Sequence, residues 1–191
     1  MKNFAVFLDR DGTINYDPGY LGNPDLVKLF PGTGKALSSL KNDLKFKLIV
    51  ISNQSGIARG FISKADVDSV NDRINLLLAP FNAQIDRFYY CPFHPDFSTA
   101  EESRCRKPSP EMVLKAANDF DIDLSGSYFI GDSVSDIKCG VNAGVKTILI
   151  QVSDDKDRIC ALKKENILPN FVARNLQEAS IFIKKDFNGD K

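Results

Sequence analysis

The chain alternates short, almost continuously apolar segments with segments of helical periodicity. An apolar strand with β-branched and aromatic residues is typical of a parallel sheet that is buried on both faces. Parallel strands need crossover connections, usually helices, so the alternation predicts βαβ units. The predicted fold class is α/β, a doubly wound, mostly parallel Rossmann-like sheet with helices on both faces. The predicted strands cover residues 4–8, 46–51, 87–90, 128–130 and 147–150.

Helices are predicted between these strands, and two of them carry N-terminal signals. Ser63 and Asp66 have the spacing of a capping box. Ser109 and Pro110 have the residue types favoured at an N-cap and at the first helical position. The predicted helices cover residues 35–41, 63–78, 109–117, 155–165 and 176–185.

Length and composition fit one compact domain. The chain has 191 residues, of which 43% are hydrophobic, and this is enough to bury a core. We expect a single domain over residues 1–187 with a loop insert at 91–108, and a frayed tail at 188–191. The 25 basic and 25 acidic residues balance, which provides no basic surface for nucleic acid.

The chain shows no pattern for export or membrane insertion. Its N-terminal apolar run is too short for a signal peptide, and no run approaches the ~20 residues that span a bilayer. A cytoplasmic protein with no membrane partner is therefore expected, with a monomer as the default state. The four cysteines are widely separated, and no disulfide framework is expected in a cytoplasmic protein.

Two carboxylates follow the first predicted strand, in the segment Asp9-Arg10-Asp11-Gly12-Thr13. Gly12 permits a sharp turn, which would direct Asp9 and Asp11 into one crevice. Anions this close repel unless a cation lies between them, and carboxylate oxygens are suitable ligands for Mg²⁺. The pattern indicates a magnesium site, although Asp and Gly are also common in ordinary turns.

Hydroxyl and amide side chains follow the second predicted strand, in the segment Ser52-Asn53-Gln54-Ser55-Gly56. Such groups, together with backbone N–H donors beside a glycine, can hold phosphoryl oxygens. Taken alone, the segment is equally typical of a polar loop.

A second pair of carboxylates, Asp132 and Asp136, follows the strand predicted at 128–130. A helix that begins near Ser133 would place the pair at its first turn, where the dipole favours anions. Asp136 could act there as a capping residue only, so Asp132 is the predicted metal ligand.

A basic pair, Arg106 and Lys107, precedes the helix predicted at 109–117. Such a pair is normally solvated, but a site with several aspartates and a phosphate requires a cation. Because ligands of open α/β sheets bind at the carboxyl ends of strands, these segments are predicted to converge.

The order DRDGT, SNQSG, RKP and GDSVSD resembles the four-motif signature of the haloacid dehalogenase (HAD) superfamily of phosphatases. The segments SNQSGIARG and CRKPSPEM are similar to the branch that contains the D-glycero-D-manno-heptose-1,7-bisphosphate and histidinol-phosphate phosphatases. The resemblance covers about residues 1–150 and implies a HAD-type sheet with a minimal cap. It implies a Mg²⁺-dependent phosphatase acting on a small phosphorylated sugar, in particular heptose 1,7-bisphosphate, which would yield the heptose 1-phosphate.

The same resemblance implies roles for individual residues. Asp9 would attack phosphorus to form an aspartyl-phosphate, and Asp11 would act as general acid and then general base. Mg²⁺ would be held by the Asp9 carboxylate, the Asp11 backbone carbonyl and Asp132. Ser52 and Lys107 would hold the phosphoryl oxygens.

Contacts with the substrate are implied as well. The segment 17–20 would close over the leaving group, and Arg106 would bind a second phosphate, for which a guanidinium fork is suited. Pairing of Arg106 with a surface carboxylate is the alternative. The predicted substrate-binding residues are Asp17, Tyr20, Asn53, Gln54, Ser55, Arg106 and Ser133.

The chain departs from the zinc-bearing members of this branch. They carry C-x-H and C-x-C in the long loop, whereas this chain keeps Cys91 and Cys105 but has Phe93 and Ser103 at the other two positions. Structural zinc is held by four N or S ligands, so no zinc is expected. The two cysteines are then expected to be small buried hydrophobes. His94, displaced by one position, could supply a third ligand.

Two alternatives to a sugar-bisphosphate phosphatase stay open. A histidinol-phosphate phosphatase would use the same catalytic set. A non-catalytic binding module could share the fold, although the joint presence of Asp9, Asp11, Ser52, Lys107 and Asp132 argues against it. A nucleic-acid 3′-phosphatase is disfavoured by the balanced charge.

Overall fold

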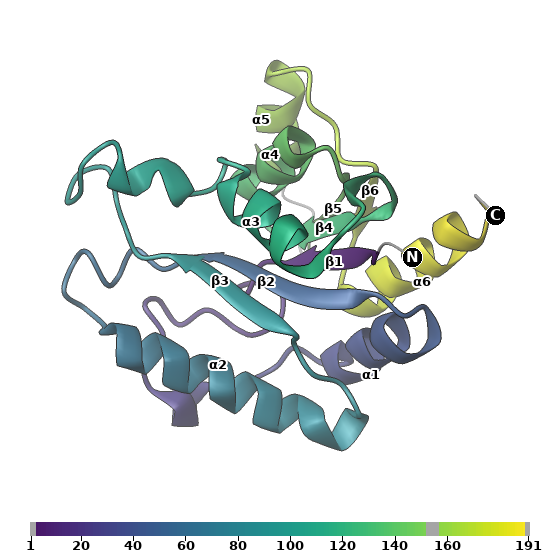
Figure 1. The fold of residues 1–191 in the computed structure, drawn as a ribbon, viewed down its shortest axis with the longest axis horizontal. Helices are drawn as coiled ribbons and strands as arrows, with labels where there is room; N and C mark the ends of the chain where they lie inside the picture. The colour runs from purple at the N-terminus through teal and green to yellow at the C-terminus, as the bar shows by residue number, and fades with distance from the viewer. Residues whose placement is uncertain (1–2, 152–156, 190–191) are drawn as a thin grey trace.

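The computed structural model describes residues 3–151 and 157–189. Over these residues the sheet has six strands in the order β3-β2-β1-β4-β5-β6 (Figure 1). Every pairing in it is parallel, which confirms the predicted doubly wound α/β class. The strands are β1 (Ala5–Leu8), β2 (Lys47–Asn53), β3 (Arg87–Cys91), β4 (Tyr128–Gly131), β5 (Lys146–Ile150) and β6 (Phe171–Ala173). The edge strand β6 was not predicted, since three residues are too few to show a period.

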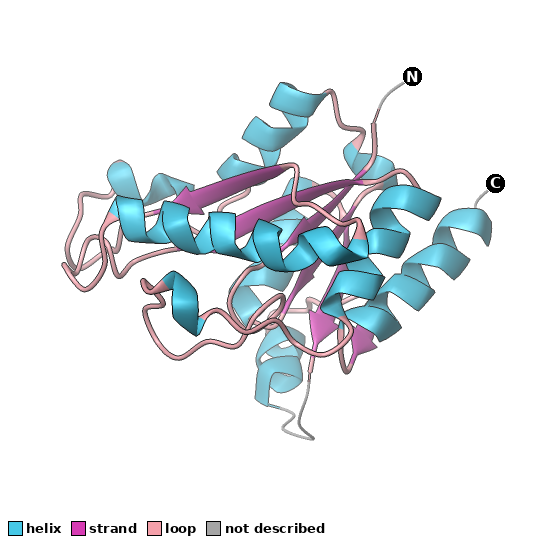
Figure 2. Ribbon diagram, turned by 90° about the horizontal axis from the view of Figure 1, so that it is seen from below, coloured by secondary structure: helices cyan, strands magenta, loops and turns pink. Residues whose placement is uncertain are grey.

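Helices cover both faces of the sheet (Figures 1 and 2). The helices α1, α2 and α6 pack on one face, and α3, α4 and α5 pack on the other. They are α1 (Thr33–Ser38), α2 (Lys64–Leu78), α3 (Glu111–Phe120), α4 (Val134–Ala143), α5 (Asp157–Lys164) and α6 (Leu176–Gly189).

Alternate residues of each strand enter different cores. In β1, Val6 and Leu8 pack against the layer that contains α2 and α6, whereas Ala5 and Phe7 pack against α3 and α4. All four side chains are fully buried. Burial on both faces is the physical reason for the uninterrupted apolar runs in the sequence.

Several helix boundaries differ from the predicted ones. The capping box of α2 is confirmed, because Ser63 and Asp66 bond reciprocally. The N-cap of helix α3 is Pro110, one residue after the predicted N-cap Ser109. Helix α1 starts two residues earlier than predicted, at Thr33, and is followed by a π-helical turn at Ser39–Asp43.

The C-terminal predictions are also corrected in part. Helix α6 continues to Gly189, so the tail predicted from residue 188 is helical over its first two residues. Residues 190–191 lie outside the described residues, as do the first two residues of the helix predicted at 155–165.

The expectation of free cysteines in the long loop was wrong. Cys91 and Cys105 form a disulfide, with their Cα atoms 5.6 Å apart. Cys91 ends β3 and Cys105 ends a short 3₁₀ helix at Glu102–Cys105. The loop between the two cysteines folds back to the end of β3 and so brings them together. Their separation of 14 residues in the sequence did not indicate a disulfide. In the disulfide neither sulfur is a thiolate, the form that binds zinc.

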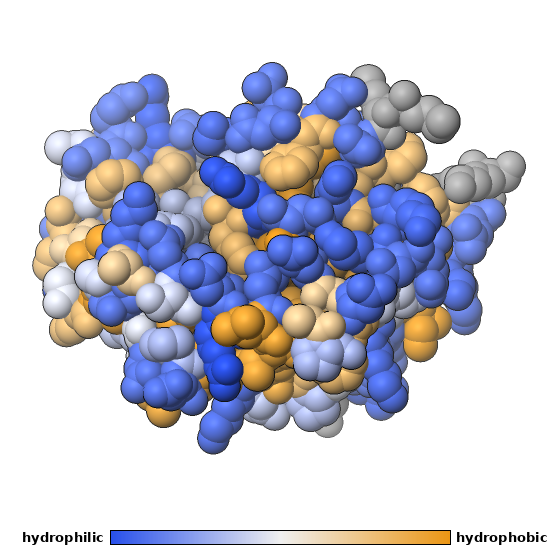
Figure 3. Space-filling view, turned by 60° about the horizontal axis from the view of Figure 1, so that its bottom comes forward, coloured by the Kyte–Doolittle hydropathy of each residue, from blue (hydrophilic) through white to orange (hydrophobic). Residues whose placement is uncertain are grey.

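The surface shows no extended apolar face in the view of Figure 3, where hydrophobic patches are interrupted by hydrophilic side chains. Within residues 3–151 and 157–189, no helix combines the length and the apolar character that a membrane span requires.

Candidate active site

Three neighbouring strands carry the predicted motifs at the same edge of the sheet. Asp9 follows β1, Ser52 is the second-last residue of β2, and Asp132 follows β4. Since β1 pairs with β2 on one side and with β4 on the other, these residues meet at the carboxyl ends of adjacent strands. This is the location at which doubly wound sheets bind ligands.

Three carboxylates gather at this edge. One oxygen atom from each of Asp9, Asp132 and Asp136 lies within 4.8 Å of the others. The predicted approach of Asp9 and Asp132 is therefore observed, and Asp136 joins them. Asp136 is fully buried and also closes the capping box of α4 with Ser133.

Lys107 is the cation of this cluster, and its side chain is buried. Its Nζ lies 2.7 Å from Asp9 Oδ1 and 2.6 Å from Asp136 Oδ1. It also donates to the Ile51 carbonyl at 2.8 Å. Although burial lowers the pKa of Lys107, the carboxylates of Asp136 and Asp9 raise that pKa above its ordinary value, so the ammonium stays charged.

The carboxylates carry more negative charge than one lysine offsets. Burial, followed by repulsion from Asp136, raises the pKa of Asp9 to about 8. The same two causes raise the pKa of Asp132 to about 6. A divalent cation among these oxygens would relieve the repulsion, and a donor set made only of oxygen suits Mg²⁺. The residues present therefore fit the expected metal.

Asp11 differs from Asp9 because its carboxylate is already paired. Arg10 binds it through Nε and Nη2, the latter at 2.8 Å. Asn15 and Gln54 donate to the same carboxylate at 2.9 Å each. Burial favours protonation, but Arg10 and these donors hold the pKa of Asp11 below its usual range.

Gly12 is required by the close approach of the segment at residues 9–13 to Asp132. Its φ of +81° lies in the left-handed region, and a Cβ there would stand 2.6 Å from Asp132 Oδ2. A side chain at position 12 would push Asp132 away from Asp9.

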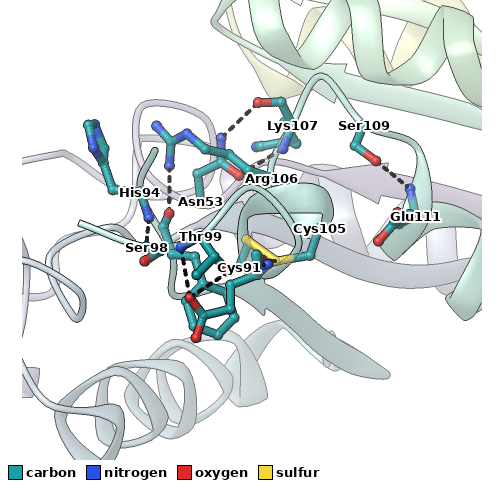
Figure 4. Close-up of a disulfide and its surroundings, with 12 residues drawn as sticks. Asn53, Cys91, His94, Ser98, Thr99, Cys105, Arg106, Lys107, Ser109 and Glu111 are labelled. Atoms are coloured by element: carbon teal, nitrogen blue, oxygen red, sulfur yellow. Dashed lines mark hydrogen bonds between the residues drawn. A yellow bond between two sulfur atoms is a disulfide. The ribbon is translucent and has the colours of Figure 1, made fainter. Parts of the chain in front are cut away.

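Two residues predicted to contact substrate have other partners. The Asn53 side chain accepts from the Lys107 backbone N–H at 3.0 Å and donates to the Lys107 carbonyl at 3.3 Å (Figure 4). The Gln54 amide bonds to Asp11, Ser52 and Arg10. These amides therefore hold protein groups in place, although both residues also line the cavity.

A cavity of about 420 Å³ opens above the cluster. Tyr20 forms part of its wall and packs against Phe61 with the two rings tilted, their centroids 4.8 Å apart. Predicted residues account for most of the lining, which comprises Asp9, Asp11, Asp17, Gly19, Tyr20, Ser52, Asn53, Gln54, Ser55, Gly56, Lys107, Asp132, Ser133 and Ser135.

Arg106 is not among the residues that line this cavity. Its Nη1 donates to the Phe93 carbonyl at 3.5 Å. Burial, followed by the charge of Arg59, lowers the pKa of Arg106. Across residues 3–151 and 157–189, neither guanidinium forms an ion pair with a carboxylate, so the alternative pairing of Arg106 with a surface carboxylate is not observed.

Sequence reasoning missed the group that holds Asp11. Arg10 is 1% exposed and donates to Asn71 of α2 at 3.2 Å. A signal existed, because Asn71 lies at a helical position adjacent to the apolar residues Val70 and Ile74 and is buried with them. A buried polar side chain of this kind requires a partner.

Comparisons with known proteins agree with this geometry. Residues 104–179 match the family model described as HAD-hydrolase-like. The chain is 41% identical over 184 residues to the D-glycero-D-manno-heptose-1,7-bisphosphate 7-phosphatase of Chlorobaculum tepidum. This alignment covers 92% of this chain and 91% of that protein. It is also 41% identical to the D-glycero-beta-D-manno-heptose-1,7-bisphosphate 7-phosphatase of Escherichia coli K12, over 75% of this chain and 76% of that protein.

A solved structure shares the fold over almost the whole chain. It is the D,D-heptose 1,7-bisphosphate phosphatase from B. bronchiseptica, crystallised with magnesium and phosphate. The two structures superpose with a TM-score of 0.83 at 28% sequence identity, and the superposition covers 96% of this chain and 99% of that protein's chain. The chain belongs to the HAD superfamily, in the group of its phosphatases that includes the D-glycero-D-manno-heptose-1,7-bisphosphate 7-phosphatases.

Proposed function

We propose that this chain is a Mg²⁺-dependent phosphatase that removes the 7-phosphate of D-glycero-D-manno-heptose 1,7-bisphosphate through an aspartyl-phosphate on Asp9. The observation that carries the proposal is the cluster of Asp9, Asp132 and Asp136 oxygens within 4.8 Å, with Lys107 bonded to two of them. The names of the relatives that are 41% identical support the substrate.

Asp9 and Asp132, together with the Asp11 backbone carbonyl, would hold the metal, and Asp136 would act beside them. The magnesium in the B. bronchiseptica structure supports the choice of ion. When bound, Mg²⁺ would offset the repulsion between the Asp9 carboxylate and a phosphate dianion.

The residues of the chain divide the reaction between them. An Asp9 oxygen forms a bond to phosphorus while the bond from phosphorus to the sugar oxygen breaks. Lys107 Nζ, 2.7 Å from Asp9 Oδ1, and Ser52 hold the phosphoryl oxygens as their charge changes. Asp11 takes up a proton from solvent before the substrate reacts, and it gives this proton to the sugar oxygen as the bond to phosphorus breaks. Ionised again, Asp11 accepts a proton from the water that hydrolyses the aspartyl-phosphate.

A second anionic group on the substrate agrees with the charges beside the cavity. Arg59 and Arg106 bring two guanidinium groups near each other, and the described residues offer neither a carboxylate. Arg59 Nη2 instead contacts His94 Nε2 at 2.8 Å. A guanidinium pair of this kind favours a bisphosphate over a substrate with one phosphate and a cationic end, such as histidinol phosphate.

The decisive experiment compares phosphate release from heptose 1,7-bisphosphate and from histidinol phosphate, with Mg²⁺ and after chelation. We expect kcat/KM to favour the heptose bisphosphate by at least about 10²-fold, since partly buried guanidinium groups without a carboxylate partner favour an anionic group over a cationic one. Equal values, or a preference for histidinol phosphate, would overturn the substrate. No phosphate release from either compound or from p-nitrophenyl phosphate would overturn the enzyme reading.

We further propose a cytoplasmic monomer whose phosphatase domain extends through α6 to residue 189. Light scattering during size-exclusion chromatography tests the oligomeric state, because a dimer would double the mass of 21.2 kDa. Limited proteolysis tests the domain extent, and cell fractionation tests the compartment.

A further inference from the structure

The Gln54 side chain has an amide orientation that its neighbours determine. Its Oε1 accepts from Arg10 Nη2 at 3.1 Å, and its Nε2 donates to Asp11 Oδ2 at 2.9 Å and to Ser52 Oγ at 2.7 Å. The reversed amide would place N–H groups against the guanidinium and an oxygen against the carboxylate. Both contacts would be repulsive, so only the observed orientation is compatible with this site.

This orientation depends on a buried guanidinium that is itself held in place. Arg10 is 1% exposed and donates through Nη1 to Asn71 Oδ1 of α2 at 3.2 Å. Gln54 is 5% exposed, and its backbone N–H bonds to the Cys91 carbonyl at 2.8 Å. The amide therefore has little freedom to turn.

The consequence concerns the single hydrogen of the Ser52 hydroxyl. Ser52 Oγ accepts from Gln54, so its own O–H must be directed elsewhere. Among the residues that the structure describes, Ser52 Oγ accepts this bond and donates none. Ser52 lines the cavity together with Asp9 and Lys107, where a phosphoryl group would lie.

We infer that Gln54 is a positioning residue that makes Ser52 a hydrogen-bond donor toward the phosphoryl group and aligns the Asp11 carboxylate beside it. The inference rests on the proposed function, since it requires a phosphoryl group in this cavity. Gln54 acts through Ser52 and Asp11 rather than on the substrate.

Gln54→Glu tests this with almost no change in shape. A carboxylate at position 54 accepts the Ser52 hydrogen and repels Asp11, so the donor toward the phosphoryl group is lost. We expect kcat for p-nitrophenyl phosphate to fall about 10²-fold or more, as for other preorganised donors. Affinity for inorganic phosphate with Mg²⁺, measured by calorimetry, should fall at least about tenfold. Gln84→Glu, the same change at an exposed position, should leave both values within about twofold.

A double-mutant cycle separates positioning from general damage. In a Ser52→Ala background, Gln54→Met, which adds no charge, should lower phosphate affinity by less than about threefold further, because the hydroxyl that Gln54 orients is absent. Losses that multiply would overturn the inference. In the wild-type background, Gln54→Met leaves the Ser52 hydroxyl free to rotate and should lower phosphate affinity less than Gln54→Glu does.

Phosphate binding keeps this test distinct from that of the proposed function. If the wild type binds phosphate with Mg²⁺ but hydrolyses no ester, the proposed function fails and the binding data still decide the part played by Gln54. Equal phosphate affinity of the wild type and Gln54→Glu would overturn the inference, as would a wild type that binds no phosphate.

Discussion

Asp9, Asp132 and Asp136 repel one another, and one buried lysine contacts two of the three. This imbalance is seen in the raised pKa of Asp9, about 8, and of Asp132, about 6, with burial as the first cause and Asp136 as the second. Clusters of carboxylates with pKa values displaced in this way are typical of functional sites. A divalent cation bound among these oxygens would offset the excess negative charge.

Asp9→Asn should abolish turnover and leave the fold intact. The amide keeps the shape of the side chain but is not a nucleophile, so no aspartyl-phosphate forms. Phosphate release and the circular dichroism spectrum provide the measurement. Turnover within tenfold of the wild type would show that Asp9 is not the nucleophile.

Asp132→Ala should raise the Mg²⁺ concentration needed for half-maximal activity. The change removes one oxygen donor and part of the negative charge that attracts the ion. We expect an increase of about tenfold or more, in the range found when groups that support a metal site are removed. A magnesium titration of activity measures it, and a superimposable curve would exclude Asp132 as a ligand.

At the scale of elements, Lys107 lies on a loop at the carboxyl ends of the strands, and two sets of contacts hold this loop in place. The Asn53 amide bonds to both the N–H and the carbonyl of Lys107, and the disulfide fixes Cys105 to the end of β3 (Figure 4). The backbone is therefore held at Lys107 itself and two residues before it, at Cys105. These fastenings account for the position of Lys107 in a segment that carries little regular structure.

Asn53→Ala should lower kcat by about 10- to 100-fold, because a small displacement of a catalytic group is costly. Asn53→Asp keeps the acceptor for the Lys107 N–H and should lose less. Steady-state kinetics with p-nitrophenyl phosphate measure both. A higher KM with unchanged kcat would instead indicate that Asn53 contacts the substrate, as the sequence predicted.

Replacing both Cys91 and Cys105 by Ser should lower the free energy of unfolding by about 3 kcal/mol, the value expected for a closed loop of this length. Denaturant titration measures the loss. Cys160→Ser, which changes an exposed free cysteine, is the control and should have no effect. Equal stability of the double variant and the wild type, both kept without reductant, would contradict a disulfide between residues 91 and 105.

At the scale of the whole molecule, two cores on opposite faces of one sheet enclose the strands that carry the site. On one face, α6 is fastened to the sheet by polar contacts as well as by packing. Asp186 of α6 accepts from Tyr128 Oη of β4 at 2.5 Å and from Lys146 Nζ of β5 at 2.7 Å. Although burial favours protonation, these two donors keep the pKa of Asp186 below its usual value.

Asp186→Asn should lower stability at pH 7 by about 1–2 kcal/mol, a modest value because the carboxylate is partly exposed. A lowered pKa in the folded protein means that this stabilisation is complete above the ordinary pKa of the unfolded chain, near 4. The stabilisation is lost as the pH falls through the folded value. The difference in the free energy of unfolding between wild type and variant, measured by denaturant titration, should therefore disappear below about pH 4. A difference in the free energy of unfolding that stays constant from pH 7 to pH 3 would contradict this linkage. Asp25→Asn, the same change at an exposed position, is the control.

Much of this could be predicted from local pattern. The strands of the sheet were predicted from apolar runs because burial on both faces leaves no room for polar residues between Phe4 and Leu8 or between Leu48 and Ile51. The approach of Asp9 to Asp132 followed from the rule that parallel strands present their carboxyl ends at one edge. Within the described residues, the short strand β6, the 3₁₀ helix at Glu102–Cys105 and several helix ends were not predicted, because short elements and boundaries depend on tertiary contacts that no local period records.

The amino-acid sequence by itself determined the α/β architecture and the residues that carry reactive groups, since both depend on periodicity and on residue type. Tertiary structure decided what each polar side chain does. It paired Gln54 with Ser52, Asn53 with the Lys107 backbone, and Cys91 with Cys105. A hydrogen bond or a disulfide needs its two atoms within a few ångströms, and chain separation does not reveal that distance until the sheet has brought the segments together.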